Sequence, residues 1–311
     1  MRPLAPDPVD ACARRRAFRQ RQRLLEGLVE RLLLLAALVA VGVTVAIVAV
    51  LVVESAPFFA QVSLSEFLGS TQWSPLFEQP RFGIWALLAG TLTTSLVAMA
   101  VAVPLGILLA VYLSEFANAR VRERVKPVLE LLAGMPTVVF GYFALLFVTP
   151  LLQKLIPGLP GFNMLSAGLV LGVMVVPYVS SLSEDALRAV PMELREAAYA
   201  LGAGRMRTSL TVVLPAAVSG VVAACILAAS RAVGETMVVA IAAGQQPNFS
   251  FDPTESAATV TAYIVQVAMG DLPQGSIGYQ SIFAAGLALF LMTLAFNLVG
   301  QWVRLRFREP Y

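Results

Sequence analysis

The chain has 311 residues, of which 58% are hydrophobic and only 13% are charged, and its mean hydropathy is +0.79. A soluble domain carries about 25% charged residues, so this composition excludes a water-soluble fold. It predicts an all-α integral membrane protein, because helices satisfy their own backbone hydrogen bonds inside a bilayer. The net charge of +3 is small, and the positions of the charges are more informative than their sum.

The chain contains no histidine, which is the commonest metal ligand and the usual proton carrier at neutral pH. Its two cysteines, Cys12 and Cys225, lie in a basic tail and in an apolar run, so we expect no disulfide. The sequence also lacks an HExxH motif, a Ser–His set and a pair of aspartates within an apolar run, which argues against an intramembrane enzyme. We therefore expect no catalytic residue, no metal ligand and no cofactor bound by this chain.

A membrane-spanning helix needs about 20 mostly apolar residues. Six stretches of the chain meet this requirement: 32–53, 84–113, 128–151, 165–183, 213–243 and 281–303. They divide the chain into four parts: a basic tail at 1–31, a first helix with an outer segment at 32–83, a helical bundle at 84–303 and a short tail at 304–311. The first stretch is too long and starts too late for the apolar core of a signal peptide, so we expect it to remain as a membrane helix.

The lysines and arginines lie almost entirely on one side of these six spans. The tails and the segments at 114–127 and 184–212 hold nineteen of the 22 basic residues. Positively charged loops stay in the cytoplasm, so we expect both termini to be cytoplasmic. The basic run at 14–23 has the composition of a nucleic-acid-binding arm. Next to a membrane span it favours contact with lipid headgroups instead, and we expect no nucleic acid partner.

The segment at 184–212 contains the most informative pattern in the chain. Pro191 suits the first position of a helix, and Gly202 suits the position just after a helix end. Glu193 and Glu196 lie in the first part of this helix, where the helix dipole favours acidic side chains. An apolar stripe is formed by residues spaced i, i+3, i+4 and i+7: Leu194, Ala197, Ala198 and Leu201. The pattern predicts a short amphipathic helix that either rests on the bilayer or receives a partner.

A longer pattern around this helix resembles the EAA loop of importer permeases in the ABC transporter superfamily. The family pattern is EAA-x3-G-x9-I-x-L-P, and Val212 stands here in place of isoleucine. The residues that match are Glu196, Ala197, Ala198, Gly202, Leu214 and Pro215. The resemblance implies a type I ABC importer permease-like bundle in which this loop docks onto a separate ATP-binding subunit. No G-x4-G-K-[ST] phosphate loop occurs in the chain, so ATP and magnesium would be bound by that partner.

Two charged residues, Arg231 and Glu235, lie inside the fifth apolar run. About 12 residues, or roughly 18 Å of helix, separate Arg231 from the outer end of that run, which places it near the middle of the membrane. Their i, i+4 spacing predicts that both side chains share one helix face. A buried structural ion pair would explain them, and so would a charged element of a solute pathway. The planar arginine fork is well matched to phosphate-type oxyanions.

The residues around this pair narrow the resemblance. The sequence from Arg231 through Glu235 to Thr236, followed by Met-Val-Val, is similar to that of phosphate-specific ABC permeases of the PstC type. Other segments similar to that family are Gly90–Leu92, Pro104–Gly106, Tyr112–Glu115, Ala133–Gly141 and Gly278–Phe283. The resemblance implies that Arg231, Glu235 and Thr236 belong to the pathway of an inorganic phosphate importer.

The resemblance also implies partners and a location. The partners are a second homologous permease of the PstA type, a dimer of ATP-binding cassette subunits and an extracytoplasmic phosphate-binding protein, and the location is a bacterial inner membrane. Permeases for molybdate, sulfate or phosphonate share the EAA loop. An ion-coupled secondary transporter or channel would also use an intramembrane ion pair. The residues alone leave both alternatives open.

Helix-breaking residues occur inside three of the predicted spans. They are Pro104 in the second, Gly134 and Pro136 in the third, and Pro177 in the fourth. Such residues either kink a membrane helix or form a hinge. For each proline separately we expect a kink.

Overall fold

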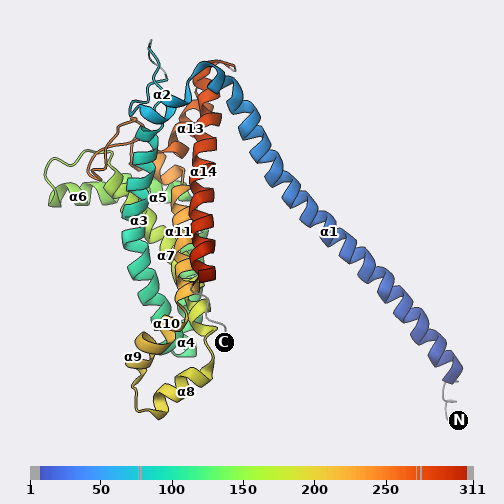
Figure 1. Cartoon of the computed structure of the whole chain (residues 1–311). Coiled ribbons are helices and arrows are strands. Elements are labelled where there is room, and N and C mark those ends of the chain that lie inside the picture. Colours follow the sequence, from blue (N-terminus) through green and yellow to red (C-terminus); the bar gives the residue numbers. More distant parts are fainter. Residues whose placement is uncertain (1–7, 76, 78, 271, 274, 307–311) are drawn as a thin grey trace. The chain divides into compact units, whose positions relative to one another are not determined.

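A computed structural model describes residues 8–75, 77, 79–270, 272–273 and 275–306, with side chains described from residue 26 onward. The chain divides into two compact units, residues 1–53 and 54–311. Helices dominate the described part, which confirms the predicted all-α class (Figure 1). The basic side chains predicted at 14–23 and the final residues of the C-terminal tail, 307–311, lie outside the described residues.

The first unit contains most of helix α1 (Pro8–Gln61), whose last turns from Glu54 onward belong to the second unit. The helix runs through the boundary predicted at residue 31. In the described part of the first unit the apolar side chains are exposed; Leu33 and Val53 are each 66% exposed. A helix that is apolar on every side and unburied needs lipid or another chain around it. These features agree with the predicted first membrane span.

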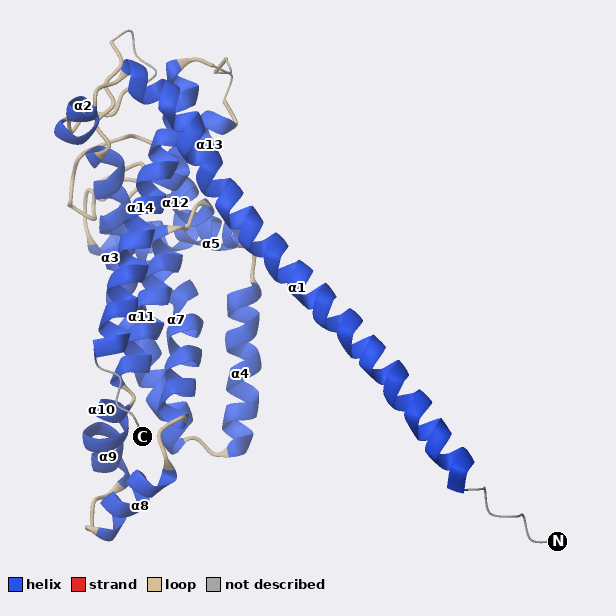
Figure 2. Cartoon of the chain, turned by 45° about the vertical axis from the view of Figure 1, so that its right-hand side comes forward, coloured by secondary structure: helices blue, strands red, loops and turns tan. Residues whose placement is uncertain are grey.

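The second unit is built around upright helices that run between two ends (Figures 1 and 2). These helices are α3 (Trp85–Val111), α4 (Ala119–Gly134), α7 (Met164–Arg188), α11 (Val218–Val233) and α14 (Ile277–Arg306). One end carries three short helices: α8 (Met192–Ala200), α9 (Arg205–Thr208) and α10 (Leu214–Ala216). The opposite end carries α2 (Leu64–Gly69) and α13 (Val260–Ala268). We call them the α8 end and the α13 end.

Shorter helical segments complete this unit. They are the π-helical turns η1 (Tyr112–Phe116), η2 (Ala144–Val148) and η3 (Ser209–Val213), and the helices α5 (Thr137–Phe143), α6 (Thr149–Leu155) and α12 (Met237–Ala242). Within the described residues five helices are long and apolar enough to cross a membrane. A sixth span results if the segments before and after Ala217, which meet at 71°, are counted as one. This agrees with the six predicted spans.

The third predicted span is not a single helix. The run expected at 128–151 comprises α4, which ends at Gly134, and the α5–η2–α6 segment, which begins at Thr137. Met135 between them has an extended backbone, with φ −67° and ψ 141°. The cause is Pro136, because a proline disfavours the helical conformation of the residue before it. Helix α4 is therefore separated from α5, and Figure 2 shows α4 upright beside α7.

Two other prolines do not break their helices. Pro104 lies inside α3 and Pro177 lies inside α7, and both helices continue past them. Neither of these prolines therefore ends its helix. Pro136 acts differently because it follows Gly134, a poor helix former that closes the last turn of α4.

Helices α3 and α7 pack at unusually short range. A Cβ atom built on Gly168 would lie 2.7 Å from the Cβ of Val97, and one built on Gly172 would lie 2.7 Å from the carbonyl oxygen of Ala98. No side chain fits at such distances, so these glycines let the two backbones approach. The two helices form the central pair of the bundle, and movement of one has to carry the other.

The α13 end is closed by an aromatic cluster. Its rings pack edge to face with centroids 5.1–6.3 Å apart, and they belong to Phe58, Phe67, Trp73, Phe82 and Tyr263. Edge-to-face aromatic pairs are favourable beyond the apolar area that they bury. The polar and aromatic segment predicted at 54–83 therefore packs onto one end of the bundle.

Candidate functional site

Helix α8 forms where the amphipathic helix was predicted in the segment 184–212. Pro191 occupies its N-cap, one residue before the position expected for it. Gly202 follows the helix end with a φ of +83°, as predicted. Its amide donates a hydrogen bond to the carbonyl of Tyr199, which is half of the pairing that ends a helix at glycine. The glycine is needed because other residues rarely adopt this backbone conformation.

The apolar stripe predicted along α8 is divided between a packed and an exposed part, and Leu194 is half-buried against an apolar cluster of the bundle. Only Ala198 of that stripe is buried, whereas Leu201 is 89% exposed and Ala197 is also exposed. Glu196 of the EAA pattern is exposed as well. The prediction did not include the packed polar side chain of this helix, because it considered apolar residues alone. The exposed residues of α8 remain open to a partner.

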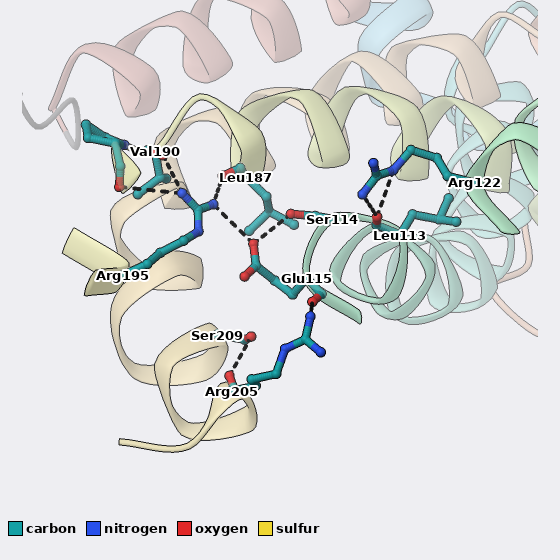
Figure 3. A network of polar contacts seen from close by, with 10 residues as sticks. Leu113, Ser114, Glu115, Arg122, Leu187, Val190, Arg195, Arg205 and Ser209 are labelled. Atoms are coloured by element: carbon teal, nitrogen blue, oxygen red, sulfur yellow. Dashed lines mark hydrogen bonds and ion pairs between the residues drawn. The ribbon is translucent and has the colours of Figure 1, made fainter. Parts of the chain in front are cut away.

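The side chain that attaches α8 to the bundle is Arg195, which the sequence did not single out (Figure 3). It is 8% exposed. Nη1 donates to the carbonyl of Val190, and Nη2 donates to the carbonyl of Leu187 at 2.9 Å and to Glu115 Oε1 at 3.1 Å. The bonds to the carbonyls brace the turn between α7 and α8, and the ion pair fixes α8 to η1. A buried arginine is tolerated here because its charge is paired and its donors are used.

The final residues of the EAA pattern join α8 to the membrane bundle. Leu214 is half-buried in a small apolar cluster at this end, and Pro215 is exposed in α10. They follow the π-helical turn η3 and precede the 71° bend at Ala217. Proline has no backbone N–H to donate to the preceding turn. The wider π-helical turn ahead of the proline accommodates this missing hydrogen bond. This part of the pattern therefore sets the angle between the α8 end and α11.

The residues expected in a solute pathway lie where the fifth span is broken. Helix α11 ends at Val233 and α12 begins at Met237, so Glu235 and Thr236 lie in the interruption. The expectation of one continuous helix from 213 to 243 is wrong here. The predicted contact still forms, because Arg231 Nη1 lies 3.2 Å from Glu235 Oε2.

The break is held by a neighbouring helix. Thr261, near the start of α13, donates a hydrogen bond from Oγ1 to the backbone carbonyl of Glu235 at 2.7 Å. A carbonyl freed from a helix in a membrane requires such a donor. Thr236 is half-buried, and its Oγ1 lies 3.4 Å from the carbonyl of Gly234. Thr261 was not predicted from the sequence, because it is distant from Glu235 along the chain.

The two charged side chains at the break differ in exposure. The Glu235 side chain is 3% exposed, whereas that of Arg231 is 39% exposed. The Arg231 guanidinium lies 5.7 Å from the centre of the Tyr178 ring on α7. Glu235 is its only ion-pair partner within the described residues. The arginine is thus held at one side by the glutamate and open at the other.

A second charged group lies nearer the α8 end and was not predicted. Glu184 on α7 is 1% exposed, and its Oε1 lies 3.5 Å from Arg122 Nε, 3.2 Å from Lys126 Nζ and 3.7 Å from Arg188 Nη1. Among the described residues neither of its oxygens accepts a hydrogen bond. A cavity of ≈ 360 Å³ is lined by residues that include Lys126, Glu184 and Tyr178. The sequence marked the basic residues only as cytoplasmic charges.

Residues 102–309 match the family described as the binding-protein-dependent transport system inner membrane component. The chain belongs to this family. The matched range includes α7, α8 and the break between α11 and α12, which are the parts that carry both sets of predicted site residues. Members of this family are transport components, so the permease is a multi-pass membrane protein and not itself an enzyme.

Several relatives of the permease are more than 30% identical to it. The probable ABC transporter permease protein YqgH of Bacillus subtilis is 33% identical over 87% of this chain and 88% of the relative. The phosphate transport system permease protein PstC of Xylella fastidiosa (strain 9a5c) is 33% identical, and that of Mesorhizobium japonicum is 32% identical. Each of these two matches covers 77% of this chain and 78% of the relative. The predicted resemblance to PstC-type permeases is confirmed.

Solved structures show the same fold. A chain of a bacterial ABC transporter that imports the acidic polysaccharide alginate superposes with a TM-score of 0.62 and 18% identity, over 92% of this permease and 100% of that chain. A chain of the MetNI methionine ABC transporter in an inward-facing conformation gives a TM-score of 0.54 and 21% identity, over 73% of this permease and 95% of that chain. The predicted type I importer permease fold is therefore confirmed.

Proposed function

We propose that the chain is the PstC-type permease subunit of an ATP-driven importer of inorganic phosphate in a bacterial inner membrane. It forms the translocation path together with a second, PstA-type permease. An extracytoplasmic binding protein delivers phosphate, and a dimer of ATP-binding subunits holds ATP and magnesium. The α8 end and both termini face the cytoplasm, which agrees with the nineteen basic residues on that side of the predicted spans.

The observation that carries the proposal is that Arg231 is paired on one side and partly exposed on the other. Its partner Glu235 is almost fully buried, while the Arg231 side chain is 39% exposed beside a break in a membrane helix. An exposed arginine inside a membrane bundle is costly and favours a functional role. Its fork donates two parallel hydrogen bonds to an oxyanion, which a lysine cannot do.

Glu235 gives this site the properties that a transport path requires. With no anion present it neutralises Arg231 and holds it in place at 3.2 Å. The pair has no net charge, so a phosphate that arrives binds weakly and leaves again. A permanently unpaired arginine would bind the anion more tightly and release it slowly. Thr236 lies in the same break and follows Glu235 directly in the chain.

The exposed face of α8 supports a separate ATP-binding partner. Glu196 and Ala197 are exposed although they match a pattern that the family uses for docking, and the neighbouring Leu201 is exposed as well. Small residues allow close approach of another chain, and the fully exposed Leu201 supplies apolar area to bury. We propose that this face receives the ATP-binding subunit.

The test is uptake of radiolabelled phosphate into liposomes that contain the permease with its partner subunits and binding protein. We expect uptake that requires ATP and that excess sulfate or molybdate does not inhibit. Glu196→Ala is expected to lower ATP hydrolysis and uptake together, because it weakens docking. Uptake without ATP would point to an ion-coupled transporter. Preferential uptake of another oxyanion would refute the phosphate assignment.

A further inference from the structure

We infer that Glu115 is the positioning residue through which α8 moves the membrane helices. The inference rests on the proposed function, in which the partner ATPase acts on α8. Helix α8 buries only two side chains, Arg195 and Ala198. Ala198 offers a single methyl group and Leu194 packs half-buried against the apolar cluster at this end, so the contacts of Arg195 form the polar attachment of this helix to the bundle. The ion pair with Glu115 is the one contact of Arg195 that leaves the α7–α8 turn.

Glu115 lies at a junction of four elements (Figure 3). Its carboxylate belongs to η1, the π-helical end of α3, and its Oε1 accepts a hydrogen bond from Ser114 Oγ at 2.8 Å as well as the bond from Arg195. Its backbone carbonyl accepts a hydrogen bond from Arg205 Nη2 of α9 at 2.7 Å, and the Arg205 guanidinium lies over the ring of Phe116. Two of the three short helices of the α8 end, α8 and α9, are thus fixed to the same turn.

The same turn is connected to α4 and α7. Arg122 of α4 donates to the carbonyl of Leu113 in η1 at 2.6 Å, and its Nε lies 3.5 Å from Glu184 of α7. Helix α7 also carries Tyr178, whose ring contacts Arg231. A continuous series of contacts therefore leads from α8 through η1, α4 and α7 to the arginine at the break.

The geometry of η1 suits a moving junction. A π-helical turn at a helix end leaves carbonyls outside the regular helical bonding pattern, and here two arginines bind them. Helix α3 is pressed against α7 at Gly168 and Gly172, so a pull on η1 acts on both helices together. Glu115 contributes the ionic bond that transmits the pull, and Arg195 is its counterpart on the side of the ATPase.

The test uses the complete transporter in liposomes and measures ATP hydrolysis, its stimulation by the binding protein and phosphate uptake in the same preparation. The variants are Glu115→Ala, which removes the contact, and Glu115→Gln, which keeps its shape without the charge. Because Arg195 keeps its hydrogen bonds to the carbonyls of Val190 and Leu187, we expect both variants to assemble and hydrolyse ATP. The number of phosphate ions moved per ATP is expected to fall about tenfold in Glu115→Ala and less in Glu115→Gln. The matched control is Glu123→Gln, an exposed carboxylate of α4 that forms no ion pair within the described residues.

A double-mutant cycle with Arg195→Lys separates transmission from simple stabilisation. If Glu115 acts through Arg195, the loss of coupling in the double variant is no larger than that in Glu115→Ala alone. The inference is overturned if Glu115→Ala keeps the wild-type ratio of phosphate to ATP. It is also overturned if uptake and hydrolysis fall in parallel with the amount of assembled complex in both variants, because the contact would then only hold the fold.

The outcome is separable from that of the proposed function. If the wild-type complex hydrolyses ATP but moves no phosphate, the substrate assignment fails. The role of Glu115 is then tested by ATP hydrolysis alone. Loss of the Glu115 contact is still expected to remove the stimulation of hydrolysis by the binding protein. If the binding protein still stimulates ATP hydrolysis in Glu115→Ala as it does in the wild type, the proposed role of Glu115 is overturned whatever the solute is.

Discussion

Two of the arginine–glutamate pairs among the described residues have nearly the same length but differ in exposure and in their other contacts. Arg195 and Glu115 meet at 3.1 Å near the α8 end, and Arg231 and Glu235 meet at 3.2 Å at the break in the fifth span. In the first pair both side chains are at most 10% exposed, and the arginine also binds two carbonyls. In the second pair the arginine is 39% exposed.

The difference separates a structural arginine from one that is available to a ligand. The donors of Arg195 are committed to groups of the chain itself, so an anion could bind it only by breaking those bonds. Arg231 retains donors that no carboxylate engages within the described residues. A pair of charges inside a membrane protein is therefore not informative by itself; the number of donors already used decides between the two roles.

The largest expected effect comes from removing Arg195, the arginine whose donors bind groups of the chain itself. Arg195→Ala leaves the Glu115 carboxylate buried without its partner, and breaking a buried ion pair costs about 3–5 kcal/mol. We expect a large fall in the thermal stability of the purified permease and loss of assembly with the ATP-binding subunit. Thermal unfolding in detergent and copurification measure the two effects. Normal stability would show that Arg195 is not the attachment of α8.

Arg231→Lys is expected to have the opposite profile. Lysine keeps the charge beside Glu235 but loses the fork, and a charge-assisted hydrogen bond contributes about 1.5–3 kcal/mol. Phosphate uptake is expected to fall by about 10- to 100-fold, with thermal stability and assembly close to wild type. Loss of stability equal to that of Arg195→Ala would make both pairs structural and remove the distinction.

Gly202→Ala tests the α8 end without changing a charge. The φ of +83° disfavours any side chain by about 1–2 kcal/mol, although a Cβ atom there would meet nothing within 4 Å. We expect weaker binding of the ATP-binding subunit and a proportionate loss of uptake. Gly204→Ala is the matched control, since Gly204 has an ordinary φ of −74° and equally open space. Equal effects of the two substitutions would contradict the role of the Gly202 backbone.

The smallest expected effect concerns the neighbour that supports the break. Thr261→Val removes the donor to the Glu235 carbonyl while keeping the side-chain shape, at a cost of about 1 kcal/mol. We expect uptake to fall a few-fold while ATP hydrolysis stays near wild type. Thr211→Val is the control, because the Thr211 hydroxyl bonds only within its own turn at the α8 end. Unchanged uptake in Thr261→Val would show that the break does not depend on α13.

Local chemistry was sufficient to predict part of both regions. The helix around Glu196 and its glycine end follow from neighbouring residues. The separation of α4 from α5 at Pro136 also has a local cause, but one continuous span had been predicted there. The contact of Arg231 with Glu235 was also predictable, since the two residues are four positions apart in the sequence. These features depend on interactions within one or two helical turns.

The remaining features depend on residues that are far apart in the chain. Glu115 and Arg195 are separated by 80 residues, and Glu235 and Thr261 by 26. The interruption after Val233 was not predicted, because the run is long and mostly apolar and the carbonyl that the break exposes is satisfied by Thr261 from another helix. No periodicity within one segment encodes such contacts, which require the packed bundle.

The most direct test of the account is whether phosphate reaches the break in the assembled transporter. Thr236→Cys, in a chain with Cys12→Ser and Cys225→Ala, places a thiol in the break, directly after Glu235, and leaves Arg231 intact. We predict that a small thiol-specific cation modifies this cysteine, that phosphate slows the reaction, and that the protection disappears when Arg231→Lys is added. A cysteine that does not react, or whose reaction phosphate does not slow, would contradict the assignment of Arg231 to the pathway.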